Sequence, residues 1–447
     1  MPRPLIAIGQ MELPMRLNTA AAIPKIYTRE GAIAKRITAE QELRRSVLSC
    51  LLWEREFYEI GEDISARITR LAAEVPRETV AALAVEAREQ FHLRHVPLLL
   101  LTALVRRGGS GVAETIAATI QRPDEMAELL AIYWKDGKRP LAKQLQRGLA
   151  MAFAKFDEYA LAKYDRNGPV KLRDVLFLSH AKPDTPEREA LYRRVVDRQL
   201  ATPDTWEVAL SNGAGKRETF TRLLSEGQLG YLALLRNLRN MTDAGVDTGL
   251  IAEAIVARKG ARRVLPFRYV AAARACPQME PYLDQALCEA VNDGPRMSGK
   301  TVVLVDVSGS MDSRLSAKSD LTRMDAAAAL ASVISGDLRV FTFSEHIAEV
   351  PPRRGMAGVD AVIRSQPHGA TYLGKAIQTV NAQVPHDRLI VITDEQSHDR
   401  VGDPVCKHAY MINVASAKNG VGYGQWTHID GFSEAVLRFI AENERDG

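Results

Sequence analysis

The sequence has little of what marks a secreted, disulfide-linked or membrane-spanning chain. It contains only four cysteines in 447 residues, with no Cys-x-x-Cys pair and no Cys/His spacing typical of zinc. No apolar stretch reaches the roughly 18 uncharged residues that span a bilayer, and the apolar run near the amino terminus is too short for a signal peptide. We therefore expect a cytoplasmic protein without a disulfide framework or a membrane segment.

A strong charge of either sign is also missing. Lysine and arginine total 59 against 55 aspartates and glutamates, a formal net charge of +4, and this excess is too small to indicate nucleic acid by itself. Apolar residues make up 46% of the chain and charged residues 26%, as in an ordinary soluble globular protein. Because 447 residues are too many for one core, we expect two or three domains.

Helical periodicity dominates the chain from about residue 28 to 293. Thr38 and Gln41 have the spacing of a capping box, which marks the start of a helix. Successive helices with short connections predict stacked helical pairs, an α-solenoid, although no strict sequence period is present. Apolar residues recur at three- and four-residue spacing in segments that include 39–58, 77–91, 96–107, 122–135 and 140–156.

The pattern changes at 292–300, a stretch with glycine and proline that is the best linker candidate. Short continuous apolar strands that alternate with helices indicate a parallel sheet covered on both faces. The second part of the chain is therefore predicted to be a doubly wound α/β domain. The β-branched runs lie at 301–307, 339–343, 389–394 and 409–415, with helical stretches between them at 323–334 and 373–384.

Oxygen-bearing side chains follow two of the predicted strands. Asp306, Ser308 and Ser310 come at the end of the first run, and Asp394 ends the third. Thr371 lies in a loop just before a helix. Because ligands of such sheets bind beyond the carboxyl ends of the strands, we expect the three segments to converge. Their hydroxyl and carboxylate oxygens suit Mg²⁺ or Mn²⁺, with a coordination position left for water or for a partner's oxygen.

Catalytic interpretations fit this cluster less well. A nucleophilic serine needs a G-x-S-x-G elbow, which is absent around Ser308, and a phospho-aspartate mechanism usually places a second acid at that position. The segment 211–220 fails as a phosphate-binding loop because Arg217 stands where Ser or Thr is required. With no general base, nucleophile or nucleotide motif found, we expect a protein that is not an enzyme.

The D-x-S-x-S, threonine and aspartate set resembles the metal-ion-dependent adhesion site of von Willebrand factor A domains. The resemblance assigns Asp306, Ser308 and Ser310 to the first loop, Thr371 to the second and Asp394 to the third. One feature departs from many such domains, because Asp394 is followed by glutamate and glutamine and not by glycine. The extra carboxylate is expected to add negative charge near the ion.

Charge is unevenly distributed in the helical part. Residues 135–182 and 216–274 each contain 11 lysines and arginines against 5 aspartates and glutamates. Such an excess is most often a solvated helix face, but arginine is also the usual bidentate donor to phosphate. The interleaved aromatic side chains are equally compatible with the core: Phe153, Phe156, Tyr159 and Tyr164. Charge alone leaves both interpretations open.

The helical part followed by a von Willebrand A domain resembles the Ro autoantigen family, whose helical module is called TROVE. In that family HEAT-like repeats form a ring closed by the von Willebrand A domain. Single-stranded 3′ ends of misfolded RNA enter the central hole, and Y RNA or similar structured RNA binds the basic outer surface. The resemblance is carried by segments 39–61, 162–183, 234–241 and 262–274.

The resemblance implies a division of the chain and a set of partners. It implies an N-terminal extension (1–23), a TROVE helical-repeat domain (24–293) and a von Willebrand factor A domain (294–447). The expected partners are small non-coding RNA of the Y RNA type, 3′ ends of misfolded RNA and, through the RNA, an exoribonuclease such as polynucleotide phosphorylase. The protein is expected to be a monomeric ring that serves as an RNA quality-control or scaffold factor.

The family's RNA-contacting positions, before and within its "LSH" motif, fall here on Lys163, Arg166 and His180. Arg173 is a further candidate by its charge only. The chain is one residue shorter between Lys163 and Arg166 than animal members of the family. Without the resemblance, His180 is also interpretable as a residue that ends a helix.

Two classes of function therefore remain open. The first is a Ro-type RNA-binding protein, in which lysine and arginine neutralise phosphates and affinity falls steeply with salt. The second is a protein-interaction scaffold, in which the Mg²⁺ site at Asp306 captures an acidic side chain and RNA is irrelevant.

Overall fold

The computed structural model describes residues 25–444, apart from 29, 35, 49–60, 166–167, 262–263, 265, 293–295, 315–320, 416, 418–419 and 432–434. Helices make up the first part of the chain, and a six-stranded sheet with flanking helices makes up the second. This is the predicted fold class. Over the described residues, no helix combines the length and the apolar character that crossing a bilayer requires.

The predicted helical segments form helices in the structure, within a few residues of their expected ends. The exception is the segment 39–58, which is helical to Leu48 and whose remainder lies outside the described residues. The capping box at the start of α1 is present, because the Gln41 backbone N donates to Thr38 Oγ1 at 3.2 Å and the Thr38 N donates to Gln41 Oε1 at 2.9 Å. The helices are α1 (Ala39–Leu48), α2 (Gly61–Glu74), α3 (Arg77–Glu89), α4 (His95–Arg107), α5 (Val112–Thr119), α6 (Pro123–Tyr133), α7 (Lys143–Phe153), α8 (Glu158–Tyr164), α9 (Leu172–Ser179), α10 (Pro186–Asp197), α11 (Trp206–Ser211), α12 (Lys216–Ser225), α13 (Tyr231–Asp243), α14 (Thr248–Ala257), α15 (Phe267–Ala275), the 3₁₀ turn η2 (Pro277–Met279) and α16 (Glu280–Asn292).

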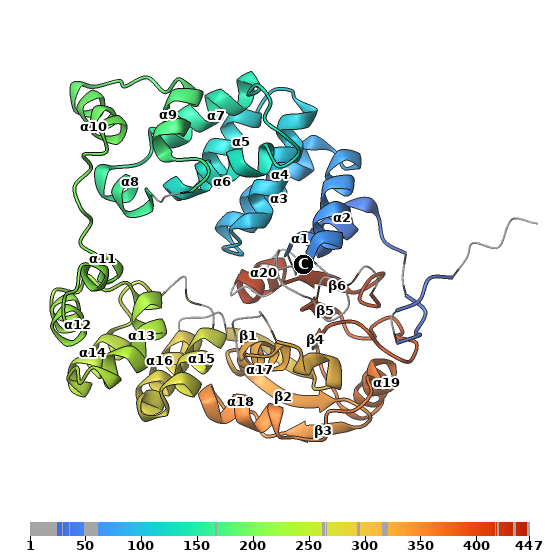
Figure 1. Ribbon diagram of the computed structural model, residues 1–447. Helices are drawn as coiled ribbons and strands as arrows, with labels where there is room; N and C mark the ends of the chain where they lie inside the picture. The colour runs from blue at the N-terminus through green and yellow to red at the C-terminus, as the bar shows by residue number, and fades with distance from the viewer. Residues whose placement is uncertain are drawn as a thin grey trace, which may run out of the picture.

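These helices stack in two layers. Helices α1, α3, α5 and α7 contact one another in sequence, and α2, α4 and α6 form the second layer. Each layer buries the apolar stripe that the sequence periodicity predicted, for example Leu83 of α3 and Leu101 of α4. In Figure 1 the helices follow an arc that leaves the α/β domain at α1 and returns to it at α16. The stacked pairs of the sequence prediction are therefore confirmed.

The sheet has the strand order β3-β2-β1-β4-β5-β6, and all neighbouring strands are parallel except β2 and β3. Four strands coincide with predicted runs. The sequence prediction missed β3 and β6, which have only four residues each and are partly exposed. The strands are β1 (Arg296–Asp306), β2 (Ser335–Phe343), β3 (Ile347–Val350), β4 (Arg388–Thr393), β5 (His408–Asn413) and β6 (Thr427–Asp430).

The predicted linker 292–300 is shorter in the structure. Helix α16 continues to Asn292, and β1 begins at Arg296, where it pairs with Ser335 of β2. A register shift between Met297 and Lys300 accommodates Gly299 within the strand. Backbone pairing with β2 thus turns part of a linker-like sequence into strand.

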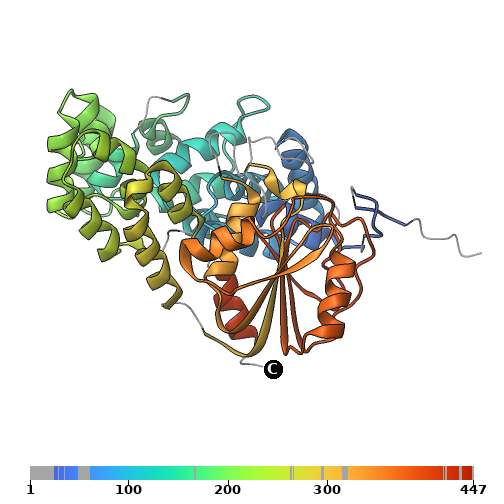
Figure 2. The ribbon, with the colours of Figure 1, turned by 90° about the horizontal axis from the view of Figure 1, so that it is seen from below.

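Helices cover both faces of the sheet, as Figure 2 shows. Val303 and Val305 of β1 belong to one apolar core, and Val302 and Leu304, which alternate with them, belong to another. This explains why the strands read as continuous apolar runs. The remaining elements are the 3₁₀ turn η3 (Gly309–Asp312) and helices α17 (Arg323–Ser332), α18 (Gly355–Ile363), α19 (Leu373–Gln383) and α20 (Ala435–Asn443).

The apolar core divides within the helical series. One cluster of buried residues comes from α1 to α10. A second joins α12 to α16 with one face of the sheet, so that Leu287 of α16 and Met324 of α17 share a core. The connection between α10 and α11, on the left of Figure 1, lies between the two clusters. The second half of the helical series is thus packed as one body with the α/β domain.

Helix α1 contacts the far end of the chain, beside β6. Arg45 of α1 is fully buried, and its Nη1 lies 2.6 Å from Glu395 Oε2, which is also fully buried. The Arg45 Nε donates to the carbonyl oxygen of Ala417 at 2.6 Å. His428 of β6 forms the second ion pair of Glu395 at 2.6 Å. A charged cluster therefore joins the start of the helical series to the α/β domain.

Two glycines leave space for this contact. A Cβ at Gly420 would lie 1.9 Å from Glu395 Oε2, and a Cβ at Gly431 would lie 2.2 Å from the backbone oxygen of Leu48 in α1. Gly431 also has φ +87°, a conformation that other residues rarely adopt. Glycine is thus needed at both positions for α1 to approach the loops of the α/β domain.

We predict that Arg45→Met strongly destabilises the protein. The substitution leaves the buried Glu395 carboxylate with one partner fewer, and breaking a buried pair from one side costs about 3–5 kcal/mol. The thermal unfolding temperature, measured by circular dichroism, should fall clearly. Arg44→Met is the matched control, because Arg44 pairs with Glu86 at a partly exposed site, where a pair is worth about 0–1 kcal/mol. Equal effects of the two substitutions would contradict the role given to Arg45.

His428 predicts a loss of stability at alkaline pH. Burial lowers the pKa of His428, but the charges of Asp430 and Glu395 outweigh burial and raise it to about 9. Because this pKa lies above the ordinary value of 6.5, the protonated imidazole contributes stability below about pH 6.5 that is lost as the pH rises toward 9. The unfolding temperature of the wild type should fall over this window. His428→Gln should show a smaller fall, and an unchanged slope would refute the assignment.

Candidate metal and nucleic-acid sites

Asp306 ends β1 and lies fully buried at the carboxyl edge of the sheet. Its Oδ1 accepts a hydrogen bond from the backbone N of Ser308 at 2.9 Å, and its Oδ2 accepts one from Thr393 Oγ1 at 2.6 Å. Ser308 Oγ lies 3.2 Å from Ser310 Oγ, in the turn that follows the strand. The alternation of residues 306, 308 and 310 thus gathers three side chains on one side of the first loop.

Hydrogen bonds hold the second and third segments against the first. The Gly309 N donates to the Gly369 carbonyl at 3.0 Å, in the loop that leads to Thr371. The His398 N donates to the Thr371 carbonyl at 2.8 Å. Asp394 follows β4, the strand paired with β1, and is fully buried. The structure therefore brings the loops of all five predicted metal-site residues to the same edge of the sheet.

The electrostatics of this cluster favour a cation. Burial and the nearby charge of Asp394 both raise the pKa of Asp306. Two carboxylates that repel each other in a buried position, with hydroxyl oxygens beside them, provide the hard oxygen donors that Mg²⁺ and Mn²⁺ prefer. The residues present thus fit a divalent cation, although which side chains coordinate it stays a prediction. Groups of three or more histidine, cysteine, aspartate or glutamate side chains able to hold a metal are absent among the described residues.

The glutamate that follows Asp394 has a different role from the one expected. Glu395 has φ +60°, so it occupies the left-handed conformation that glycine adopts most easily. Its carboxylate is bound by Arg45 and His428, and these two charges outweigh burial and lower its pKa to about 2. Its charge is thus neutralised within the contact with α1. No sequence pattern signals the pairing of Arg45 with Glu395, because the two residues are 350 positions apart.

The predicted RNA-contacting residues lie on two consecutive helices. Lys163 is exposed in the last turn of α8, and Arg173 is half-exposed in α9, with its Nε 3.8 Å from Asp174 Oδ1. His180 is exposed at the carboxyl end of α9 with φ +53°, so it also occupies the helix-ending position that its sequence context suggested. Arg166 lies outside the described residues.

The structure separates the aromatic residues of this region into two groups. Phe153 and Phe156 are buried in the core, whereas the Tyr159 side chain is 50% exposed. The Lys163 Nζ lies 5.7 Å from the Tyr159 ring centroid and 5.9 Å from that of Tyr164. The core interpretation is therefore right for the two phenylalanines, and the tyrosines of α8 accompany a predicted RNA-binding lysine.

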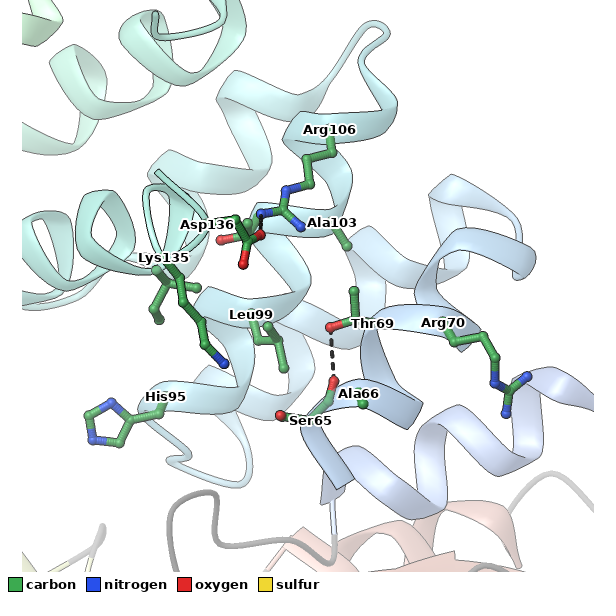
Figure 3. A pocket seen from close by; sticks show the side chains of 12 residues that line it. Ser65, Ala66, Thr69, Arg70, His95, Leu99, Ala103, Arg106, Lys135 and Asp136 are labelled. Carbon is green, nitrogen blue, oxygen red and sulfur yellow. Dashed lines mark hydrogen bonds and ion pairs between the residues drawn. The ribbon is translucent and has the colours of Figure 1, made fainter. Parts of the chain in front are cut away.

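A cavity of about 710 Å³ between α2, α4 and α6 is a further candidate (Figure 3). Apolar side chains such as Leu99 lie beside charged ones. Arg106 contacts Asp136 at 2.8 Å, and Arg70 contacts Glu74 at 3.1 Å. An anion bound here would compete with carboxylates for both arginines, so we do not assign this cavity to phosphate.

Comparison with known proteins gives two family matches. Residues 193–300 match the TROVE domain, and residues 301–396 match the von Willebrand factor type A domain. The crystal structure of the Deinococcus radiodurans RO (RSR) protein is similar, with a TM-score of 0.60 at 17% sequence identity. The match covers 91% of this chain and 100% of that chain. The two proteins therefore share a fold.

The order of domains agrees with the resemblance noted in the sequence. The TROVE match ends at residue 300, and the von Willebrand factor type A match begins at the next residue. The domain matches support an RNA-binding protein of the Ro type. The two domain matches, their order and the shared fold all agree with a similarity to the Ro autoantigen family.

Proposed function

We propose that the protein binds small structured non-coding RNA of the Y RNA type and the 3′ ends of misfolded RNA, as a cytoplasmic quality-control or scaffold factor. The observation that carries the proposal is the exposure of Lys163, Arg173 and His180 on α8 and α9, in the helical series that continues into the TROVE match. Cations on one surface bind the phosphate backbone and position the RNA. An exoribonuclease such as polynucleotide phosphorylase would then act as a partner through the RNA.

The arrangement of the helices supports the proposed ring. Both ends of the helical series contact the α/β domain, through Arg45 of α1 and through Asp284 of α16, whose Oδ1 accepts from the Met356 N at 2.7 Å. A single chain would then form the ring as a monomer, with the α/β domain as its closing element. We propose that unpaired RNA ends enter the space that the series surrounds.

We propose that the cluster at Asp306 holds Mg²⁺ or Mn²⁺. The side chains of Ser308, Ser310, Thr371 and Asp394 would complete the protein's part of the coordination shell. When bound, the ion would attract an oxygen ligand from outside the chain. Such a site would bind a ligand through the ion and would not need to catalyse a reaction.

A second candidate function is a metal-dependent protein-interaction scaffold. One observation favours it: Ser310 is half-exposed, and Tyr372, next to Thr371, is 38% exposed. The metal site can therefore be reached from outside, and a partner's acidic side chain is the ligand that would suit it. In this alternative RNA plays no part.

We predict that charge reversal on α8 and α9 weakens RNA binding and reduces its dependence on salt. Lys163→Glu with Arg173→Glu removes two phosphate contacts, so the slope of log K against log salt concentration should fall by about 2. Binding of a fluorescent RNA hairpin with a single-stranded 3′ tail would be measured by anisotropy at several salt concentrations. Arg353→Glu with Arg364→Glu, at exposed positions of the α/β domain, makes the same change of charge elsewhere and should have a small effect. Salt-independent binding by the wild type would refute RNA binding of this kind.

We predict that millimolar Mg²⁺ raises the thermal unfolding temperature relative to EDTA, because an ion that binds only the folded state stabilises it. Asp306→Asn should remove this shift, since it deletes a proposed ligand and the repulsion with Asp394. Asp312→Asn, in the same loop at a half-exposed position, should retain it. A shift that survives in Asp306→Asn would exclude the site. Unchanged RNA binding by this variant would separate the metal site from the RNA surface.

A further inference from the structure

A cleft of about 640 Å³ lies between the end of α6 and helix α9, on the helical series that carries the proposed RNA surface. The segment after α6 contributes Trp134, Lys138 and Arg139, and α9 contributes Asp174 and Phe177. Aromatic faces and cations thus line the same cleft. No residue of this cleft was among the predicted site residues.

Phe177 is unusually exposed for a phenylalanine, with 59% of its surface accessible. Its neighbours in α9, Val175 and Leu176, are buried in the core, so Phe177 points away from the packed face. Trp134 is half-buried, and its indole Nε1 donates to the Arg139 carbonyl at 2.8 Å. This hydrogen bond fixes the plane of the indole and satisfies its only donor. The cleft therefore contains two aromatic rings: Trp134, whose orientation is fixed by a hydrogen bond, and Phe177, which is exposed.

The charges around the rings are mostly positive. Lys138 is exposed, and its Nζ lies 5.9 Å from the Trp134 ring centroid. The Arg139 Cζ lies 5.4 Å from the centroid of the Tyr133 ring. The Arg139 Nη2 lies 3.8 Å from Asp136 Oδ2. Asp174 is the acid of the cleft, and its Oδ2 accepts from the Lys171 backbone N at 2.9 Å. This bond holds Asp174 at the start of α9, and the two cations of the cleft, Lys138 and Arg139, outnumber this one carboxylate.

The position of Phe177 on α9 connects the cleft to the proposed RNA surface. Arg173 precedes Phe177 by four residues, the spacing at which side chains of a helix are neighbours, and His180 follows α9 directly at its carboxyl end. A single RNA strand bound by Arg173 and His180 would therefore pass close to Phe177. An aromatic ring between phosphate-binding cations is the arrangement by which proteins hold single-stranded nucleic acid, because every base has a face that stacks.

We propose that this cleft binds one unpaired base of the RNA, stacked on Phe177 and bordered by Trp134, with the adjoining phosphate near Lys138. The inference rests on the proposed function and adds a contact that phosphate binding alone does not provide. It gives preference for RNA with a single-stranded segment over a fully paired duplex. Stacking is tolerant of sequence, so no particular base is required.

The test compares two RNA probes with the full-length protein: a duplex with a single-stranded 3′ tail of adenosines and a blunt duplex. Phe177→Ala should weaken binding of the tailed RNA roughly 5- to 100-fold and leave binding of the blunt duplex unchanged. The salt dependence should keep its slope, because stacking releases no counterions. Phe177→Tyr should restore affinity. A 2-aminopurine in the tail should lose fluorescence on binding the wild type and lose less on binding Phe177→Ala.

Tyr282→Ala is the control, because it removes an exposed aromatic ring from α16. If the wild type binds tailed RNA and Phe177→Ala binds it equally well, the stacking site is refuted while RNA binding stands. An equal loss for tailed and blunt RNA also refutes it, as does an equal loss in Tyr282→Ala. If the wild type shows no salt-dependent binding of either RNA, the proposed function is refuted and the inference is refuted with it.

Discussion

The arrangement of the two parts of the chain depends on the burial of one guanidinium. Arg45 extends from α1 into the α/β domain, where it is shielded completely from solvent. A cation in this position is tolerated only with charged and polar partners, and Glu395 and the Ala417 carbonyl provide them. Small residues at positions 420 and 431 and the left-handed backbone at Glu395 all serve this contact. Sequence choices in three separate loops thus follow from the contact of α1 with the α/β domain.

The same contact brings the metal-site loop and the helical series together. Asp394 and Glu395 are adjacent in sequence, yet one belongs to the proposed metal site and the other to the contact with α1. Residues before α1 reach the same loop, because Thr28 Oγ1 donates to the Ser397 carbonyl at 2.8 Å, and Ser397 Oγ donates to the Thr371 carbonyl at 3.3 Å. Asp394, a proposed ligand of the ion, is therefore the direct neighbour in sequence of Glu395, which belongs to the contact between the first and last parts of the chain.

Much of the fold was predictable because burial leaves a periodic trace in sequence. The four central strands have both faces covered and read as apolar runs, and their polar ends identified Asp306 and Asp394. Strands β3 and β6 were missed because four residues with exposed positions carry no such trace. Arg44 and Arg45 illustrate the limit further, since the two adjacent arginines look equivalent in the sequence. One lies at a partly exposed surface and the other in the interior, and only the packing of two distant segments decides which. Phe177 was not among the predicted site residues, because an apolar residue in a helix is normally assigned to the core, whereas Phe177 is exposed.

The division of the apolar core has a consequence for fragments of this protein. Met324 of the α/β domain and Leu287 of the last helix before it belong to one core. Cutting the chain between the two predicted domains would expose apolar surface on both pieces. A fragment that begins between α10 and α11 would instead keep the apolar core of α12 to α16 and the sheet, but it would lose α1 and leave the buried Glu395 without Arg45. The boundary that sequence motifs mark and the boundary between the two apolar cores are therefore different places.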